Sequence, residues 1–171
     1  MKFKFSAVFV VALVALAVFT YIRMRPPFEK GAGVPDFTLK SVAGTSVSLS
    51  QFKGTPVIVH FWATWCSMCK DEMDLLNAFA ADFSDIEVLA ISEDNSSAEA
   101  VSRFFEGKKL YFNVLLDEKG RVADEYKNYK IPETYFVDRN GSFVYKESGA
   151  ISWNSVKIRE EIAKNFGLPS R

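Results

Sequence analysis

The feature that most restricts the fold is a pair of cysteines placed where an apolar segment gives way to an amphipathic one. Cys66 and Cys69 are the only cysteines among the 171 residues. Residues 56–62, PVIVHFW, are almost continuously apolar and β-rich, which is typical of a strand buried on both faces of a sheet. Residues 66–83 then carry apolar side chains at helical spacing. The cysteines therefore open a helix that follows a central strand, and in open α/β sheets such junctions gather functional sites.

The spacing of the two cysteines predicts reversible disulfide chemistry. The N-terminus of a helix offers free N–H groups and the positive end of the helix dipole, and both favour the thiolate form of Cys66. Cys69 lies on the same helical face and can close a small ring with Cys66. The Cys66 thiolate would attack a partner's disulfide, and Cys69 would then release the reduced partner. A zinc site is disfavoured because it needs four ligands and the chain adds only one histidine.

The remaining segments predict an α/β fold with a mixed central sheet, helices on both faces and an additional N-terminal β-hairpin. The hairpin signals are alternating residues around Ala43-Gly44 and around Asn140-Gly141. The strands are expected at 35–39, 46–49, 56–62, 86–92, 113–116, 134–138 and 142–146, and the helices at 66–83, about 97–106, 121–126 and 155–166.

The N-terminus carries a separate signal. Residues 5–22 contain no charged side chain, and eighteen residues of helix come close to the ~30 Å thickness of the hydrocarbon layer. We therefore expect residues 1–25 to be a membrane anchor or a cleaved signal segment, 26–33 a tether and 34–171 the folded domain. The anchor is favoured, since the apolar run continues past the candidate cleavage site. The slightly acidic remainder of the chain gives no electrostatic footprint for nucleic acid.

Several motifs occur in a characteristic order: PDFTL at 35–39, FWATWC at 61–66, CKDEM at 69–73 and IPETY at 131–135. Together they resemble the TlpA/ResA/CcmG group of membrane-anchored thioredoxin-like proteins. The resemblance implies a thioredoxin fold and a thiol-disulfide oxidoreductase without cofactor or metal. It further implies a dithiol reductant of exported proteins, such as apocytochrome c during cytochrome c maturation. The electrons would come from a membrane donor of the DsbD/CcdA type, with the domain on the periplasmic or extracytoplasmic side of a bacterial inner membrane. Disulfide turnover also favours that side.

The same resemblance implies substrate-binding residues beside the cysteines. Pro132, after Ile131, matches the cis-proline that faces the cysteine pair in this group. A cis X–Pro bond turns the backbone sharply and would expose the adjacent peptide group to a bound substrate strand. Trp65 directly precedes the first cysteine, and we expect it to face the substrate.

Two further side chains are candidates for proton exchange with the buried thiol. Glu72 matches the acid three residues after the second cysteine in the family pattern, and a carboxyl near Cys69 would couple its titration to that of the thiol. An exposed helix carboxylate is the alternative. His60 stands where this group commonly has Asn. Its imidazole could take or hold the proton of Cys69, or it could be a core histidine bound to a backbone carbonyl.

Departures from the family leave other activities open. Ser67 and Met68 separate the cysteines, whereas this group often has Pro before the second cysteine, and that dipeptide affects the reduction potential. A disulfide oxidant or isomerase is therefore an alternative. A copper metallochaperone could hold Cu(I) with the cysteines and Met68, although copper-delivery relatives space their cysteines by three residues. A peroxidase is disfavoured because the Trp-Cys-x-x-Cys segment replaces the peroxidatic loop.

Overall fold

The computed structural model describes residues 7–24, 28–95 and 97–169. Seven strands within this part of the chain form one sheet. They are β1 (Thr38–Ser41), β2 (Ser46–Ser48), β3 (Val57–Trp62), β4 (Glu87–Ser92), β5 (Asn113–Leu116), β6 (Glu133–Val137) and β7 (Phe143–Ser148). The helices are α1 (Ala7–Met24), α2 (Ser67–Asp82), α3 (Ala98–Phe104), α4 (Arg121–Glu125) and α5 (Val156–Phe166), with a 3-10 helix η1 (Leu49–Phe52).

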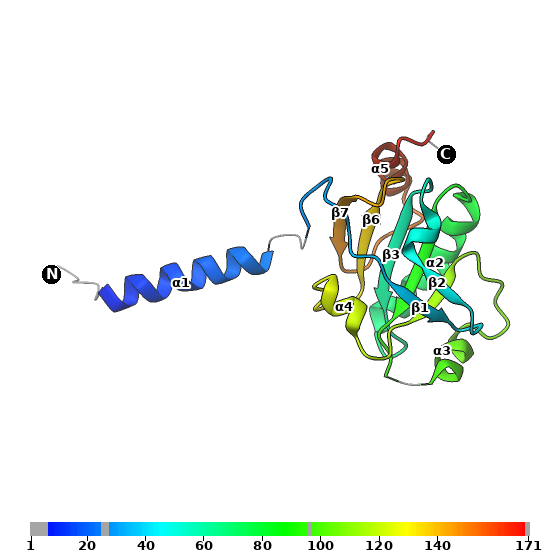
Figure 1. Cartoon of the computed structure of the whole chain (residues 1–171), viewed down its shortest axis with the longest axis horizontal. Coiled ribbons are helices and arrows are strands. Elements are labelled where there is room, and N and C mark those ends of the chain that lie inside the picture. Colours follow the sequence, from blue (N-terminus) through cyan, green and yellow to red (C-terminus); the bar gives the residue numbers. More distant parts are fainter. Residues whose placement is uncertain (1–6, 25–27, 96, 170–171) are drawn as a thin grey trace.

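The sheet is mixed and its strand order is β2-β1-β5-β4-β3-β6-β7. β3 and β4 pair in parallel, as do β4 and β5, whereas β6 runs antiparallel to β3 and β7 antiparallel to β6. β1 and β2 form the predicted N-terminal hairpin, which joins the sheet through β1 and β5. The mixed thioredoxin-like sheet is thus confirmed, and β3 is a central strand as predicted (Figure 1).

The first strand begins later than its alternating sequence predicts. Residues 35–37 are not paired in the sheet, and β1 starts at Thr38. The Asp36 carboxylate accepts hydrogen bonds from the backbone N–H groups of Phe37 and Ser50, at 2.9 and 3.0 Å. A side chain that binds nearby backbone donors in this way competes with strand pairing.

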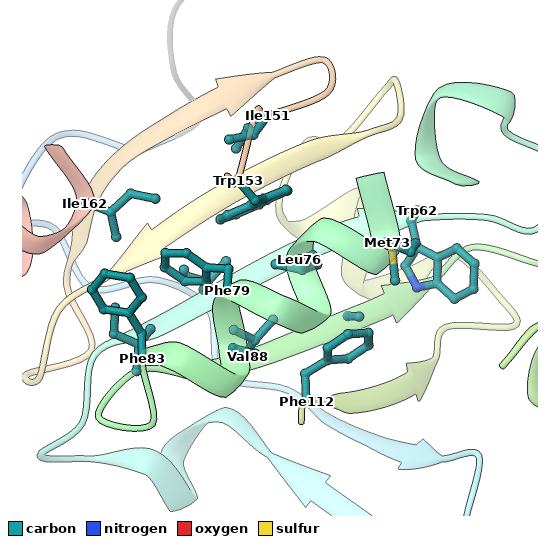
Figure 2. Close-up of a cluster of buried hydrophobic side chains, with 14 of the residues drawn as sticks. Trp62, Met73, Leu76, Phe79, Phe83, Val88, Phe112, Ile151, Trp153 and Ile162 are labelled. Atoms are coloured by element: carbon teal, nitrogen blue, oxygen red, sulfur yellow. The ribbon is translucent and has the colours of Figure 1, made fainter. Parts of the chain in front are cut away.

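Alternate residues of β3 face two separate hydrophobic cores. Ile58 and Trp62 contribute to a core that also contains residues of α2, α3 and α5. Figure 2 shows side chains of this core, including Trp62, Phe79 and Trp153. Val57, Val59 and Phe61 point to the second core, which is covered by α4 and by segments near the N-terminus. Both faces of β3 are therefore packed against buried side chains along its whole length.

The predicted apolar segment 5–22 begins outside the described residues, and most of it forms α1. In Figure 1, α1 lies apart from the α/β domain. No helix in the described part of the chain has the length and hydrophobicity needed to cross a membrane.

Residues 28–33, the described part of the predicted tether, contact the domain. Gly31 donates its N–H to the Phe143 carbonyl at 2.8 Å, and Phe143 donates to the Ala32 carbonyl at 2.7 Å. The Phe28 ring packs edge-to-face on three aromatic rings of the second core. Residues 25–27 lie outside the described residues.

Candidate active site

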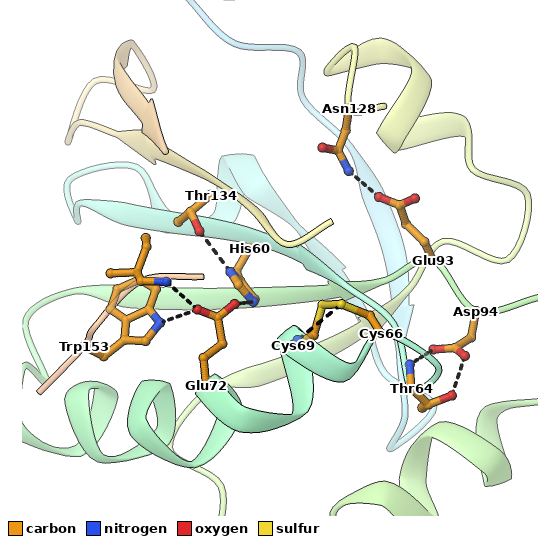
Figure 3. Close-up of a disulfide and its surroundings, with 11 residues drawn as sticks. His60, Thr64, Cys66, Cys69, Glu72, Glu93, Asp94, Asn128, Thr134 and Trp153 are labelled. Atoms are coloured by element: carbon orange, nitrogen blue, oxygen red, sulfur yellow. Dashed lines mark hydrogen bonds and ion pairs between the residues drawn. A yellow bond between two sulfur atoms is a disulfide. The ribbon is translucent and has the colours of Figure 1, made fainter. Parts of the chain in front are cut away.

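The two cysteines are joined where β3 meets α2, as the sequence predicts. Cys66 is the N-cap of α2 and forms a disulfide with Cys69, with the two Cα atoms 5.3 Å apart. The backbone N–H of Cys69 donates a hydrogen bond to Cys66 Sγ at 3.2 Å. Cys66 keeps 7 % of its surface exposed, whereas Cys69 is fully buried. Cys66 is therefore the sulfur that a partner can reach, and the helix start offers a donor to its thiolate (Figure 3).

Two large apolar side chains are exposed beside the disulfide. Trp65 and Met68, on either side of Cys66, are 69 % and 53 % exposed. The Ile131–Pro132 peptide bond is cis, as the resemblance implies. β6 starts directly after Pro132, and its first residue pairs with Phe61 near the end of β3. Pro132 therefore lies at the same end of the sheet as the disulfide. The roles of Trp65, Ile131 and Pro132 in binding substrate remain predictions.

A buried acid fixes the chain that follows Pro132. Glu133 is 1 % exposed and accepts hydrogen bonds from Ser148 Oγ at 2.6 Å and Tyr135 Oη at 2.8 Å. Lys146 Nζ lies 2.9 Å from its Oε1. The carboxylate is thus paired and hydrogen-bonded, as a buried charge requires. Nothing in the local sequence singled out Glu133, because two of its three partners, Lys146 and Ser148, come from the next strand of the hairpin.

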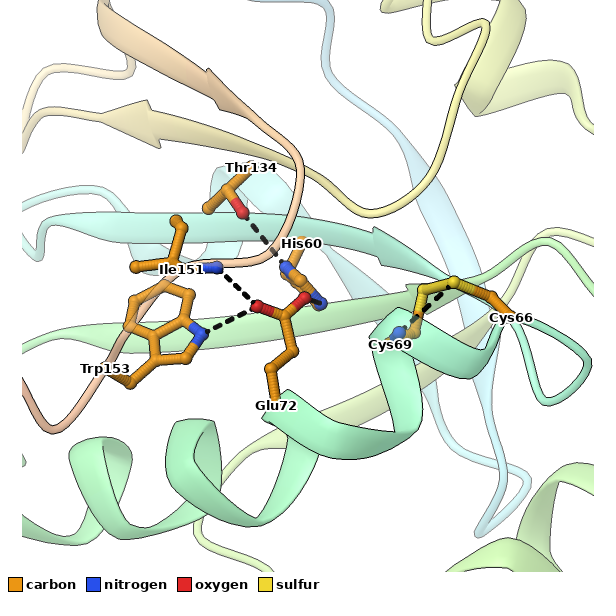
Figure 4. A network of polar contacts seen from close by, with 7 residues as sticks. All are labelled: His60, Cys66, Cys69, Glu72, Thr134, Ile151 and Trp153. Carbon is orange, nitrogen blue, oxygen red and sulfur yellow. Dashed lines mark hydrogen bonds and ion pairs between the residues drawn. A yellow bond between two sulfur atoms is a disulfide. The ribbon is translucent and has the colours of Figure 1, made fainter.

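Glu72 points into the domain and not into solvent, which excludes the exposed helix carboxylate. It is 3 % exposed, and its Oε2 accepts hydrogen bonds from the Ile151 N–H at 2.7 Å and from Trp153 Nε1 at 3.3 Å. Its Oε1 lies 3.3 Å from Nε2 of His60. Glu72 is one helical turn after Cys69, so the two side chains lie on the same face of α2. Figure 4 shows this network beside the disulfide.

His60 is also fully buried, but its partners are side chains and not the backbone carbonyl of the alternative interpretation. Its Nδ1 lies 3.0 Å from the hydroxyl of Thr134, which occupies the paired position on β6. Burial lowers the pKa of His60 to about 3 and raises the pKa of Glu72 to about 7, against the opposing effect of its two hydrogen bonds. His60 is therefore neutral at neutral pH, and its 3.3 Å contact with Glu72 is not an ion pair. Neither His60 Nε2 nor Glu72 Oε1 has a hydrogen-bond partner among the described residues.

A third buried acid, Asp94, holds the segment that leads into Cys66. The Asp94 carboxylate accepts hydrogen bonds from the Thr64 N–H at 2.9 Å, from the Thr64 hydroxyl at 2.6 Å and from Ser92 Oγ at 2.8 Å. Asp94 is 4 % exposed. Sequence reasoning missed it, although its place directly after a buried parallel strand was an available signal.

Glu93 also lies at this end of the sheet. Its carboxylate accepts a hydrogen bond from Asn128 Nδ2. Burial and nearby acids raise the pKa of Glu93 to about 7. Sequence reasoning missed this residue as well, because its partner comes from the distant segment after α4.

The structure thus brings Cys66, Cys69, Glu72 and His60 into one cluster. Trp65 directly precedes Cys66, and Pro132 lies at the same end of the sheet. A thioredoxin-like sheet with a Cys-x-x-C disulfide at the start of the helix after its central strand defines a class of protein, the thiol-disulfide oxidoreductases. Within that class the chain belongs to the AhpC/TSA family, which it matches over residues 31–146.

Individual relatives agree with this class. Over 161 residues the chain is 33% identical to the thiol-disulfide oxidoreductase ResA of Oceanobacillus iheyensis, and the match covers 88% of this chain and 83% of that protein. It is 29% identical to the sporulation thiol-disulfide oxidoreductase A of Bacillus subtilis, with 75% and 81% covered. A putative thiol:disulfide interchange protein DsbE of Chlorobium tepidum superimposes with a TM-score of 0.74 at 27% identity, over 82% of this chain and 99% of that one. The protein is a thiol-disulfide oxidoreductase of the ResA type.

Proposed function

We propose that the protein works as a dithiol reductant of exported proteins, with apocytochrome c as the first candidate substrate. The supporting observation is that the two buried titratable side chains beside Cys69, His60 and Glu72, carry no positive charge. Burial keeps His60 neutral and disfavours ionisation of Glu72, so neither side chain supplies the positive charge that would stabilise thiolates. A disulfide couple becomes strongly oxidising when its reduced form is stabilised. The surroundings of Cys69 therefore favour a reducing couple.

The reaction follows from the exposure of the two sulfurs. The Cys66 thiolate attacks one sulfur of the substrate disulfide, and the other substrate sulfur leaves as a thiolate and takes up a proton. Cys69 loses its proton and attacks Cys66, which releases the second substrate thiol and forms the Cys66–Cys69 disulfide. Two electrons have then passed to the substrate. A membrane dithiol donor of the DsbD/CcdA type would return the protein to its reduced form.

The proposed location is the extracytoplasmic side of a bacterial inner membrane, with residues 1–25 as the anchor. The uncharged segment 5–22 supports it, together with the need for a compartment in which disulfides turn over. Fractionation of cells that express the full chain tests this proposal. Recovery in the membrane fraction, with the domain open to externally added protease, is expected, and a soluble cytoplasmic protein would contradict it.

The direction of electron flow is tested by the reduction potential of the Cys66–Cys69 couple. A value near about −270 mV, as in thioredoxin, is expected, whereas a value near about −120 mV would indicate an oxidant. The substrate is tested by trapping. Cys69→Ser in membranes should accumulate a mixed disulfide between Cys66 and a cytochrome-assembly protein or apocytochrome. Cys66→Ser is the matched control and should trap none, because Cys69 is buried.

A further inference from the structure

The two oxygens of Glu72 have different partners, and this difference locates the exchangeable proton. Oε2 accepts from the Ile151 backbone N–H and from the Trp153 indole N–H. Both groups can only donate, so Oε2 must remain an acceptor. Oε1 is buried and has no hydrogen-bond partner within the described residues, and the same is true of Nε2 of His60, which lies 3.3 Å from it. When Glu72 is protonated, the proton therefore lies on Oε1, between Glu72 and His60.

His60 can match either state of Glu72 because a neutral imidazole has two tautomers. With the proton on Nδ1, Nε2 is an acceptor and suits the protonated carboxyl. With the proton on Nε2, the ring donates to the ionised carboxylate. Nδ1 changes from donor to acceptor between the two states. Its partner, 3.0 Å away, is the Thr134 hydroxyl, which can accept or donate.

We propose that His60 and Thr134 form a tautomer switch that allows Glu72 to gain and lose its proton beside Cys69 while the imidazole stays neutral. In the protonated state Glu72 Oε1–H donates to Nε2, and Nδ1–H donates to Thr134. In the ionised state Nε2–H donates to Glu72, and the Thr134 hydroxyl donates to Nδ1. One proton leaves the pair between these states. His60 and Thr134 are thus positioning residues that act through Glu72.

The switch adds a proton-transfer step to the proposed function, and its role in catalysis depends on that function. When an incoming thiolate attacks Cys66 Sγ, the S–S bond breaks and its electron pair goes to Cys69 Sγ. The Cys69 thiolate then takes a proton from Glu72, which becomes a carboxylate. The imidazole stays neutral in this step because Nδ1 releases one proton through the Thr134 hydroxyl and Nε2 takes up one from water. In the reverse direction the carboxylate takes the proton of the Cys69 thiol, and the thiolate attacks the mixed disulfide. Without a change of tautomer, the ionised carboxylate would face the lone pair of Nε2 in a dry site.

Other charged groups around Glu72 point elsewhere. On α2 itself, Lys70 and Asp71 are exposed. From α5, Arg159 pairs with Asp82 at the far end of α2. From β4, Glu87 is bound by Asn113 at the opposite end of the strand.

On β6, the neighbours of Thr134 along the strand turn to the other face of the sheet, where Glu133 is held by Lys146. The connection from β7 to α5 contributes only the two neutral donors already named. The group that titrates near neutral pH in this part of the oxidised site is therefore Glu72, beside the neutral ring of His60.

The single histidine allows a direct test by NMR. Nitrogen-15 spectra of the oxidised full-length protein distinguish the two neutral tautomers from the imidazolium. We expect the Nδ1–H form at about pH 5, the Nε2–H form at about pH 9 and no imidazolium between them. The carboxyl carbon of Glu72 should titrate with the same midpoint. An imidazolium in this range, or one tautomer throughout, would overturn the switch.

Two variants separate the switch from a purely structural role. Glu72→Gln removes the titrating partner, so His60 should keep a single tautomer from about pH 5 to about pH 9. Thr134→Val leaves Nδ1 without a partner and should also abolish the change of tautomer, whereas Thr134→Ser should restore it. A tautomer change that persists in Thr134→Val would refute the role of the hydroxyl. These spectra are recorded without a redox partner and test only the switch. A measured oxidising potential would contradict the proposed reductant function but would not contradict the tautomer switch.

Discussion

At the scale of single residues, the site combines an accessible sulfur with a buried acid. Cys66 is the less buried member of its pair, with 7 % of its surface exposed, and Glu72 follows the fully buried Cys69 by one helical turn. The cost of burying a carboxyl is what makes Glu72 useful, because it moves the pKa of the group to the pH at which thiols exchange. The same burial ties Glu72 to the stability of the fold.

The pKa of Glu72 predicts how stability changes with pH. Its pKa rises from 4.5 to about 7 on folding, so the folded state binds the proton more tightly than the unfolded state. The resulting stabilisation is complete below about pH 4.5 and is lost as the pH rises through about 7. Compared with Glu72→Gln, the wild type should lose on the order of 3 kcal/mol of unfolding free energy across this window. Urea denaturation at a series of pH values measures the difference.

Asp71→Asn is the matched control for this measurement, because Asp71 is the exposed neighbour of Glu72 on α2. Its unfolding free energy should keep a constant offset from the wild type. His60 contributes the opposite dependence, since its pKa falls on folding, but it is present in both proteins and cancels in the comparison. Parallel curves for wild type and Glu72→Gln would show that Glu72 ionises normally.

The unequal burial of the sulfurs predicts unequal reactivity in the reduced protein. Cys66 lies at the N-terminus of α2 and keeps some exposure to solvent, whereas Cys69 is fully buried and is therefore shielded from the reagent. Iodoacetamide at neutral pH should therefore modify Cys69→Ser faster than Cys66→Ser by about tenfold or more. Mass spectrometry follows both reactions. Equal alkylation rates for the two natively folded variants would contradict the assignment of Cys66 as the attacking sulfur.

At the scale of secondary structure, the site depends on how the loop between β3 and α2 is held. Asp94, which follows β4, binds both the backbone and the side chain of Thr64. The neighbouring parallel strand thus fixes the segment that delivers Cys66 to the helix start. A short loop fixed at both ends by strands positions the sulfur more accurately than α2 alone could.

Asp94→Asn should loosen this loop. An amide has only one acceptor oxygen and would turn its NH2 group toward a donor of Thr64 or Ser92, so a buried polar group loses its partner. We expect a loss of about 1–3 kcal/mol in unfolding free energy and slower alkylation of Cys66. Thr64→Val removes only the hydroxyl contact and should cost less. If Asp94→Asn were as stable and as reactive as the wild type, the loop would be held by other contacts.

The elements were predictable where one local signal decides them. The apolar run of β3, the hairpin turn at Asn140-Gly141 and the helical stripe of α2 are each encoded by adjacent residues. The role of the cysteine pair follows from its spacing at the start of α2, whereas Glu72 became a candidate through the family resemblance. The contacts of Glu72 with Ile151 and Trp153 were not predictable, because they join segments about 80 residues apart.

Whether a polar residue is buried was likewise out of reach. Glu72, Glu133 and Asp94 look like surface acids in the sequence, as Asp71 does. The strand pairing and the packing of distant segments, which a single sequence does not display, make them interior. Acidic residues are mostly exposed in folded proteins, so the sequence alone would place these three on the surface. The structure shows that all three are buried.

At the scale of the whole molecule, the two faces of the sheet are covered unequally. One face carries α2, α3 and α5, whereas the other has α4, of five residues, together with η1 and coil. The second core therefore needs side chains from outside the regular elements. Phe28, from the segment between α1 and the domain, supplies one of them.

Replacement of Phe28 tests whether this segment is a structural part of the domain. The ring contacts Tyr126, Tyr135 and Phe143 with centroid distances of 5.5, 6.3 and 5.7 Å. Phe28→Ala removes these edge-to-face contacts and uncovers the core, so we expect a loss of about 1–3 kcal/mol in unfolding free energy. Phe28→Leu keeps much of the apolar volume and should recover part of it.

Thermal denaturation followed by circular dichroism measures both Phe28 variants. The disulfide lies at the opposite side of β3 from this contact, so Cys66 alkylation should remain at the wild-type rate in both. Unchanged stability in Phe28→Ala would mean that residues 28–33 rest on the domain without supporting it, as a free tether would. A stability loss with normal thiol reactivity would instead extend the folded unit to Phe28, because the second core would then be closed by the chain that leads to α1.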